Sequence, residues 1–221
     1  RCFVYGEQQP LALQTSKPGT ARRSASRSGV QLRDAFATAF QSQLAMEQGI
    51  LITGDLGFGV FDDLSKNYPG SFMNAGITEQ SLTSMAAGLA DEGFTPFIYS
   101  IANFPTFRNL EQIRNDIAYP GKHVVVTSVG AGLSYGTLGF SHFGVEDLAI
   151  MRSLPNMRIL SPSDPLRSRL ATFSAFAVAS PTYLRLGKNG EKNFGEDMTY
   201  QYILPMSSAI WSTPLDLVLE F

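Results

Sequence analysis

The sequence predicts an α/β protein with a doubly wound, mostly parallel sheet that carries helices on both faces. Short segments that are apolar throughout, such as 123–129, alternate along the chain with longer segments of helical periodicity. Continuous apolar runs are typical of parallel strands that are buried on both faces. Glycine-containing segments follow several of these strands, at the edge where open parallel sheets bind their ligands.

The first elements are indicated by apolar spacing. A helix is expected over 30–48, because an apolar residue falls at every fourth position from Leu32 to Leu44. A short buried strand follows at 50–55 and ends in a Gly–Asp turn. The next helix is expected over 81–90, where apolar and small residues share one face.

The later elements continue the alternation of strand and helix. The strands are expected at 95–100, 123–129, 157–160 and 181–186, and the helices at 107–118, 145–152 and 164–178.

The two ends of the chain differ in composition from this domain. Residues 1–28 show little apolar periodicity and are expected to form a flexible, mildly basic leader. The α/β domain is expected over 29–190. Residues 191–221 are expected to be a linker and the start of a truncated C-terminal α/β domain, which cannot bury its apolar residues alone.

Composition excludes several classes of protein. The net charge of -2 gives no reason to expect nucleic acid or an anionic membrane as partner. No apolar run approaches the roughly 18 residues of a membrane span, and no signal peptide is visible. The single cysteine excludes an internal disulfide and favours a reducing, cytoplasmic location. One cysteine and two histidines argue against a structural zinc site.

The segment 76–80, Gly-Ile-Thr-Glu-Gln, is the most informative in the chain. It places Glu79 at the start of an apolar helix, where free backbone N–H groups and the helix dipole favour negative charge. In many proteins a glutamate in the first turn only complements the helix dipole. A chemical role for Glu79 is indicated by the other segments at the expected ligand-binding edge.

Four such segments, in their order and spacing, resemble the pyrimidine-binding domain of the transketolase family of thiamine diphosphate enzymes. They are 54–57, 74–79, 102–107 and 139–144, and the resemblance continues through 146–152 and 161–165. It covers most of 30–190. The most similar type is the C-terminal subunit of a split transketolase; deoxyxylulose-phosphate synthases and the β subunits of 2-oxoacid dehydrogenases are more distant.

The resemblance implies thiamine diphosphate as cofactor and Glu79 as the catalytic residue that binds it. In the family, the glutamate at this position hydrogen-bonds N1′ of the aminopyrimidine and so activates the cofactor. A desolvated carboxyl group is suited to sharing such a proton. The resemblance further places Phe104 and Phe107 against the aminopyrimidine, although phenylalanines are commonly core residues. Asp55 and Ile77 are expected to complete the cofactor contacts.

The resemblance also implies residues that face the substrate. His142 occupies the position of a family histidine near the reactive carbon, and is expected to be catalytic and to bind substrate. Ser128 stands where transketolases usually carry a second histidine, and 134–139 lacks the family's acidic residue. Lys188 lies where relatives often hold the substrate phosphate, although surface lysines are common. These departures leave the sugar donor and acceptor open.

One family motif is absent from the sequence. No Gly-Asp-Gly segment is followed at the family's spacing by the asparagine that helps to bind metal and diphosphate. We therefore expect no metal site in this chain. Mg²⁺ (or Ca²⁺) is expected on a partner, an N-terminal transketolase-like diphosphate-binding subunit, in a dimer or an α2β2 assembly.

The function implied is transfer of a two-carbon ketol unit between sugar phosphates, with this chain as the pyrimidine-domain subunit of a hetero-oligomer. Two alternatives stay open. The chain could serve a deoxyxylulose-phosphate synthase-like or 2-oxoacid dehydrogenase E1 beta-like reaction, or it could be a non-catalytic, truncated transketolase-like protein.

Overall fold

The computed structural model describes residues 30–188, so the leader expected at 1–28 and the tail expected at 191–221 lie outside the described residues. Six strands pair in parallel in the order β2-β1-β3-β4-β6-β5. The strands are β1 Gly49–Thr53, β2 Phe72–Asn74, β3 Thr95–Ile101, β4 Val125–Val129, β5 Arg158–Leu160 and β6 Thr182–Leu186.

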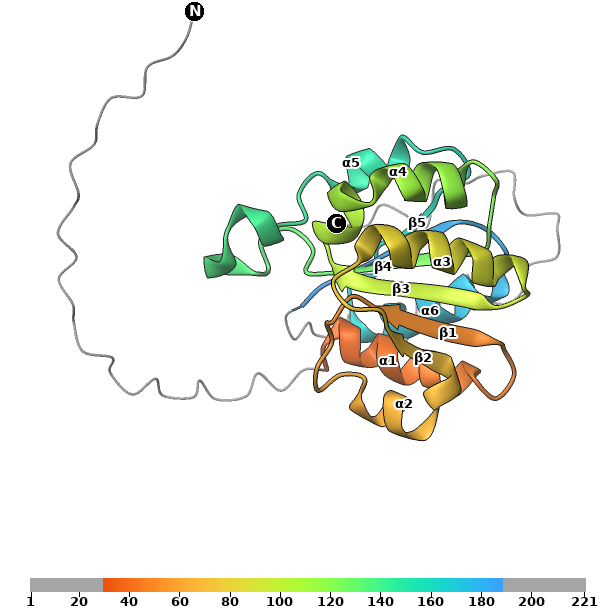
Figure 1. Ribbon diagram of the computed structural model, residues 1–221. Helices are drawn as coiled ribbons and strands as arrows, with labels where there is room; N and C mark the ends of the chain where they lie inside the picture. Colours follow the sequence, from red (N-terminus) through yellow and green to blue (C-terminus); the bar gives the residue numbers. More distant parts are fainter. Residues whose placement is uncertain (1–29, 189–221) are drawn as a thin grey trace, which may run out of the picture.

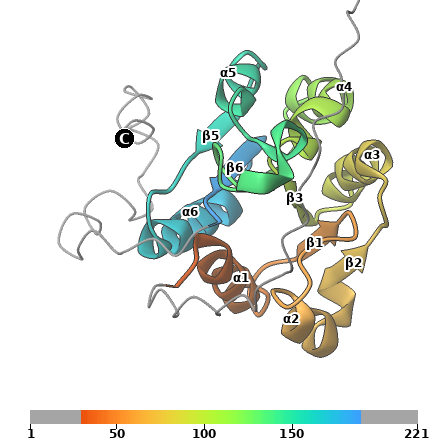
Figure 2. The same ribbon diagram turned by 90° about the vertical axis from the view of Figure 1, so that its left-hand side faces the viewer.

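Helices cover both faces of this sheet (Figures 1 and 2). One face carries α1 (Leu32–Gln43), α2 (Asp62–Asn67) and α6 (Pro165–Ala177). The other carries α3 (Glu79–Asp91), α5 (Asp147–Arg152) and the helical segment around α4 (Leu110–Gln112). The predicted doubly wound α/β fold is therefore confirmed.

Each central strand supplies side chains to two separate cores. On β1, Leu51 enters the core beneath α1 and α6, whereas Ile50 and Ile52 enter the core beneath α3. Successive side chains of a strand point to opposite faces, so a strand apolar throughout fits only a sheet covered on both sides. Phe97 of β3 lies at the centre of the first core.

Replacing Phe97 with Ala should lower the free energy of unfolding by about 3–5 kcal/mol. The ring is fully buried, with centroids 5.1 Å from Phe40 and 4.6 Å from Phe176, so truncation leaves a cavity that three elements share. The matched control is Phe107→Ala, because Phe107 is 49% exposed. Chemical denaturation of both variants measures the difference, and equal losses would contradict this account of the core.

The structure differs from the sequence-based prediction chiefly at three places, and the other predicted bounds agree within two residues. The first helix ends at Gln43, short of the predicted position 48. The short elements α2 and β2 were not predicted, because six and three residues are too few to show a period. The helix predicted over 107–118 begins at Phe104 and contains two π-helical segments, η2 (Phe104–Arg108) and η3 (Ile113–Ala118).

All six strands end at one edge of the sheet because all are parallel. The segments after β1, β2, β3, β4 and β6 therefore meet there, and the loop after β4 projects beyond the sheet (green in Figure 1). No helix within residues 30–188 has both the length and the apolar character needed to cross a membrane.

Candidate functional site

Glu79 is the first residue of α3, as the sequence predicts, and its side chain is only 2% exposed. The carboxylate lies at the end of β1, where a Cβ placed on Gly54 would be 3.7 Å from Glu79 Oε1. It borders a hollow of about 270 Å³ that Arg108 also lines, together with residues 77, 78, 80 and 81. A buried carboxylate that borders an open space can accept a hydrogen bond from a ligand.

Arg108 connects this carboxylate to an aromatic ring. Its Nη1 atom donates to Glu79 Oε2 at 2.9 Å, and its guanidinium carbon lies 4.9 Å from the centroid of the Phe104 ring. The π-helical segment η2 carries both side chains, of which Arg108 lines the hollow. Such π-helical turns are frequent at functional sites. Arg108 was not predicted from the sequence, although its spacing of four residues from Phe104 was a usable signal.

A buried amide fixes η2 against α3. Asn109, which follows η2, is fully buried and lies 2.6 Å from the hydroxyl of Thr83 on α3. With its nitrogen directed at η2, the amide also donates to the carbonyls of Pro105 and Phe104, at 2.9 and 3.1 Å. The Glu79–Arg108 pair and Phe104 therefore stand on two helices that are held together below the site.

His142 also packs against Phe104. The two ring centroids are 5.3 Å apart in an edge-to-face arrangement, and the Tyr135 ring lies 5.7 Å from His142. Ser141 Oγ is 2.9 Å from His142 Nδ1, and Asn103 Nδ2 donates to the Ser141 carbonyl at 2.6 Å. These contacts orient the imidazole and leave Nε2 as the nitrogen for proton transfer.

Two cations act on Tyr135. Lys188 Nζ lies 4.0 Å above its ring, and the charge of Arg33, at the start of α1, acts on its hydroxyl. Burial raises the pKa of Tyr135, and Arg33 partly offsets this rise. The structure thus brings Lys188 to the same edge as His142. Neither Tyr135 nor Arg33 was predicted, because only the fold brings α1 and the loop after β4 together.

The remaining predicted residues have less support from the structure as contacts of a ligand. Asp55 has a φ of 61° and an exposed side chain that accepts from Asn74 Nδ2 at 3.1 Å. Ile77 is 72% exposed at the rim of the hollow, and Phe107 is half exposed. Ser128 has no exposed surface within β4, so its position does not support the predicted contact with substrate.

The arrangement suits an aromatic heterocycle better than a metal ion. Glu79 offers a desolvated carboxylate, and Arg108 links it to the aromatic ring of Phe104. Within residues 30–188, no three His, Cys, Asp or Glu side chains are grouped so that they could hold a metal. His142, Lys188 and Arg33 add a proton-transfer group and positive charge at the same edge of the sheet.

Comparison with known proteins points to one family. Residues 28–190 match the family model described as "Transketolase, pyrimidine binding domain". One of the subunits of the apulose-4-phosphate transketolase of Phocaeicola vulgatus is 31% identical over 148 residues, which is 67% of this chain and 47% of that protein. The protein described as "Putative transketolase C-terminal section", from Methanocaldococcus jannaschii, is 38% identical over 55% of this chain and 39% of its own length.

A solved structure agrees with these matches. The one described as "Split gene transketolase, inactive beta4 tetramer" superposes with a TM-score of 0.69 and 34% sequence identity, over 76% of this chain and 55% of that chain. The chain spans less than half the length of the two curated relatives above, 47% and 39% respectively.

Proposed function

This chain belongs to the family of the transketolase pyrimidine-binding domain, and from this premise we propose that it is the pyrimidine-binding subunit of a thiamine diphosphate-dependent transketolase. The complex would transfer a two-carbon ketol unit between sugar phosphates. The observation that carries the proposal is the nearly buried carboxylate of Glu79 at the wall of a hollow, joined through Arg108 to the Phe104 ring.

In this proposal Glu79 binds N1′ of the aminopyrimidine and holds the proton shared with it. Thiamine diphosphate, when bound, supplies the carbanion chemistry of the reaction. Phe104 packs against the aminopyrimidine, Phe107 and Ile77 extend the apolar contact, and Asp55 lies on the thiazolium side. Arg108 must release Glu79 Oε2 or share it, because it already donates to that oxygen.

The part of the site around His142 would hold the sugar phosphate. His142 moves a proton to or from a substrate hydroxyl through Nε2, and its Nδ1 is already bonded to Ser141. Lys188, which lies over the Tyr135 ring, and Arg33, whose charge acts on Tyr135, supply positive charge for the phosphate.

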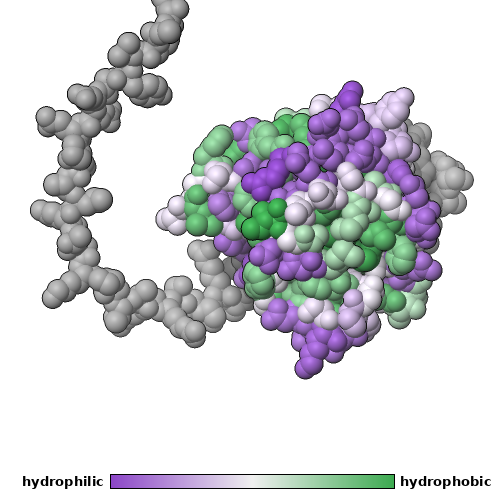
Figure 3. Space-filling view, viewed as in Figure 1, coloured by the Kyte–Doolittle hydropathy of each residue, from purple (hydrophilic) through white to green (hydrophobic). Residues whose placement is uncertain are grey.

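A second subunit completes the proposed site. It would bind the diphosphate and Mg²⁺ (or Ca²⁺) in a dimer or an α2β2 complex. We place this complex in the cytoplasm, because a chain with a single cysteine fits a reducing compartment. Apolar side chains are exposed around the site. In Figure 3 hydrophobic surface, coloured green, extends to the projecting loop after β4. The exposed residues include Phe58, Ile77, Phe107, Leu138 and Phe140. A partner that covers them would also exclude water from the hollow.

The cofactor should bind only when the partner is present. The tagged full chain is purified from its native source, its companions are identified by mass spectrometry, and thiamine diphosphate binding is titrated by calorimetry with and without Mg²⁺. We expect a companion that carries a Gly-Asp-Gly…Asn motif. We also expect saturable binding of thiamine diphosphate by the two subunits together, and not by either subunit separately. Tight, magnesium-dependent binding by this chain alone would remove the split-site proposal.

The choice of substrate tests the reaction itself. The reconstituted complex is assayed with ketose phosphate donors and, separately, with pyruvate. We expect turnover of the ketose donors. Turnover of pyruvate instead would favour the deoxyxylulose-phosphate synthase-like or 2-oxoacid dehydrogenase-like alternative.

A further inference from the structure

The segment 132–144, here called the His142 loop, is closed at its base by a pair of glycines. The Gly132 N–H donates to the Gly144 carbonyl at 2.8 Å, and the Gly144 N–H donates back at 3.0 Å. The loop between them carries Tyr135 and His142 and has exposed apolar residues, such as Phe140, at its tip. The placement of His142 therefore depends on what holds the two glycines.

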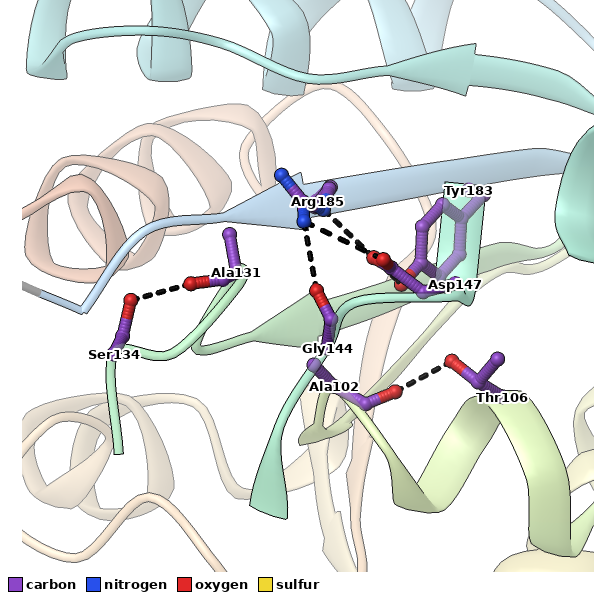
Figure 4. A network of polar contacts seen from close by, with 8 residues as sticks. All are labelled: Ala102, Thr106, Ala131, Ser134, Gly144, Asp147, Tyr183 and Arg185. Atoms are coloured by element: carbon purple, nitrogen blue, oxygen red, sulfur yellow. Dashed lines mark hydrogen bonds and ion pairs between the residues drawn. The ribbon is translucent and has the colours of Figure 1, made fainter. Parts of the chain in front are cut away.

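Arg185 of β6 holds the second glycine. Its Nη2 atom donates to the Gly144 carbonyl at 2.8 Å, and its Nε atom donates to Asp147 Oδ2 at 2.7 Å (Figure 4). The Gly144 oxygen thus accepts from Gly132 and from Arg185, which uses both of its lone pairs. The rigid fork of a guanidinium can make these contacts together, and the single ammonium of lysine is less able to do so.

Asp147 in turn fixes the guanidinium. The carboxylate is 1% exposed at the start of α5, and it also accepts from the hydroxyl of Tyr183 at 2.8 Å. Burial and the charge of Asp147 both raise the pKa of Tyr183, so the hydroxyl stays a neutral donor. The Arg185 side chain is also largely buried, at 18% exposed, and a buried pair of this kind leaves an uncompensated charge when one partner is removed.

The end of β3 constrains the same point. A Cβ placed on Gly144 would lie only 2.5 Å from the Cβ of Ala102, which directly follows β3 and lies two residues before Phe104. Gly144 therefore sits against the support of Phe104 as well as against Arg185. A shift of Gly144 would move His142 relative to the Phe104 ring.

We propose that Arg185 and Asp147 are positioning residues that set the location of His142 through the Gly144 carbonyl. Neither side chain lines the hollow at Glu79. The consequence for sugar phosphates rests on the proposed function, but the effect on the position of His142 does not. A purely structural role would instead weaken the whole domain.

Arg158 provides a matched control. It is also a partly buried arginine, and it donates to Ser174 O at 2.9 Å and to Thr182 Oγ1 at 3.2 Å. Thr182 begins β6, so Arg158 lies at the opposite edge of the sheet from Gly144. Burial lowers its pKa to about 10, so the guanidinium stays charged at neutral pH.

The test follows the two histidines of the chain by NMR in full-length Arg185→Lys and Arg158→Lys variants. His123 is a built-in reference, because its Nε2 lies 2.8 Å from the carbonyl of Ala175, next to the Arg158 partner Ser174. We expect Arg185→Lys to shift and broaden the His142 ring signals and to leave those of His123 unchanged. Arg158→Lys should perturb His123 alone.

Activity is measured with the same variants in the reconstituted complex. We expect Arg185→Lys to lower kcat/KM for the sugar phosphate about 10- to 100-fold, as displaced catalytic groups do, with thiamine diphosphate affinity unchanged. If the native complex transfers no ketol unit, the proposed function fails while the NMR result still decides this inference. Unchanged His142 signals, or equal changes in both histidines, would overturn it. If Arg185→Lys does not fold, Asp147→Asn is measured in the same way.

Discussion

Replacing Glu79 with Gln should reduce ketol transfer by the reconstituted complex about 10²- to 10⁴-fold in kcat, the range for loss of a proton-sharing group. Glutamine keeps the size of the side chain and one carbonyl oxygen. It cannot hold the proton shared with N1′ of the aminopyrimidine. Arg108, which donates to Glu79 Oε2, is 47% exposed and can be solvated after the change, so the fold should be retained.

The measurement combines two observables. One is kcat with a ketose phosphate donor, and the other is deuterium exchange at the thiazolium C2 atom of the bound cofactor. Both should fall together in Glu79→Gln. Glu92→Gln serves as the control, because Glu92 is an exposed glutamate at the far end of α3. Unchanged activity in Glu79→Gln would exclude Glu79 from the proposed role and favour the non-catalytic alternative.

The fold was predictable because most of its strands and helices are indicated by residues within the same short segment of sequence. The β4 segment is rich in valine, and such a run between glycine and proline indicates a buried strand without knowledge of its neighbours. Glu79 was placed at the start of its helix for a similar reason, since the apolar period begins directly after it. The elements α2 and β2 were missed because α2 buries only Leu64 and β2 has no fully buried residue.

The site was predictable only in part, because its contacts join distant segments. The resemblance indicated Glu79, Phe104 and His142, but not the ion pair between Glu79 and Arg108, which joins residues 29 positions apart. Tyr135 lies between Lys188 and His142 because the chain turns at Gly130, where a Cβ would meet the Tyr135 ring at 2.1 Å. Such packing follows from the folded loop and leaves no period in the sequence.

The proposed site has two halves that meet at Phe104 and can be tested separately. The Phe104 ring contacts Arg108, which is paired with Glu79, and it also contacts His142. A change on the His142 side should therefore affect the sugar phosphate and spare the events at the aminopyrimidine.

Replacing His142 with Asn should lower kcat/KM for the sugar phosphate about 10²- to 10³-fold, within the range for general acid–base catalysis. Asparagine can still donate near Ser141, but it cannot exchange a proton at neutral pH. Deuterium exchange at the cofactor C2 atom should be unchanged, because Glu79 and Phe104 stay in place. This split distinguishes a substrate-facing residue from one that supports the whole site.

The matched control for this variant is His123→Asn. His123 is the other histidine of the chain, and it contacts the Ala175 carbonyl of α6 at 2.8 Å, away from the loop that carries His142. We expect it to cost some stability and to leave kcat/KM within about twofold, as for a change remote from the chemistry. If His142→Asn stops C2 exchange as completely as Glu79→Gln does, the two halves are not independent. The assignment of His142 to the substrate would then have to be withdrawn, since its loss would act on the cofactor.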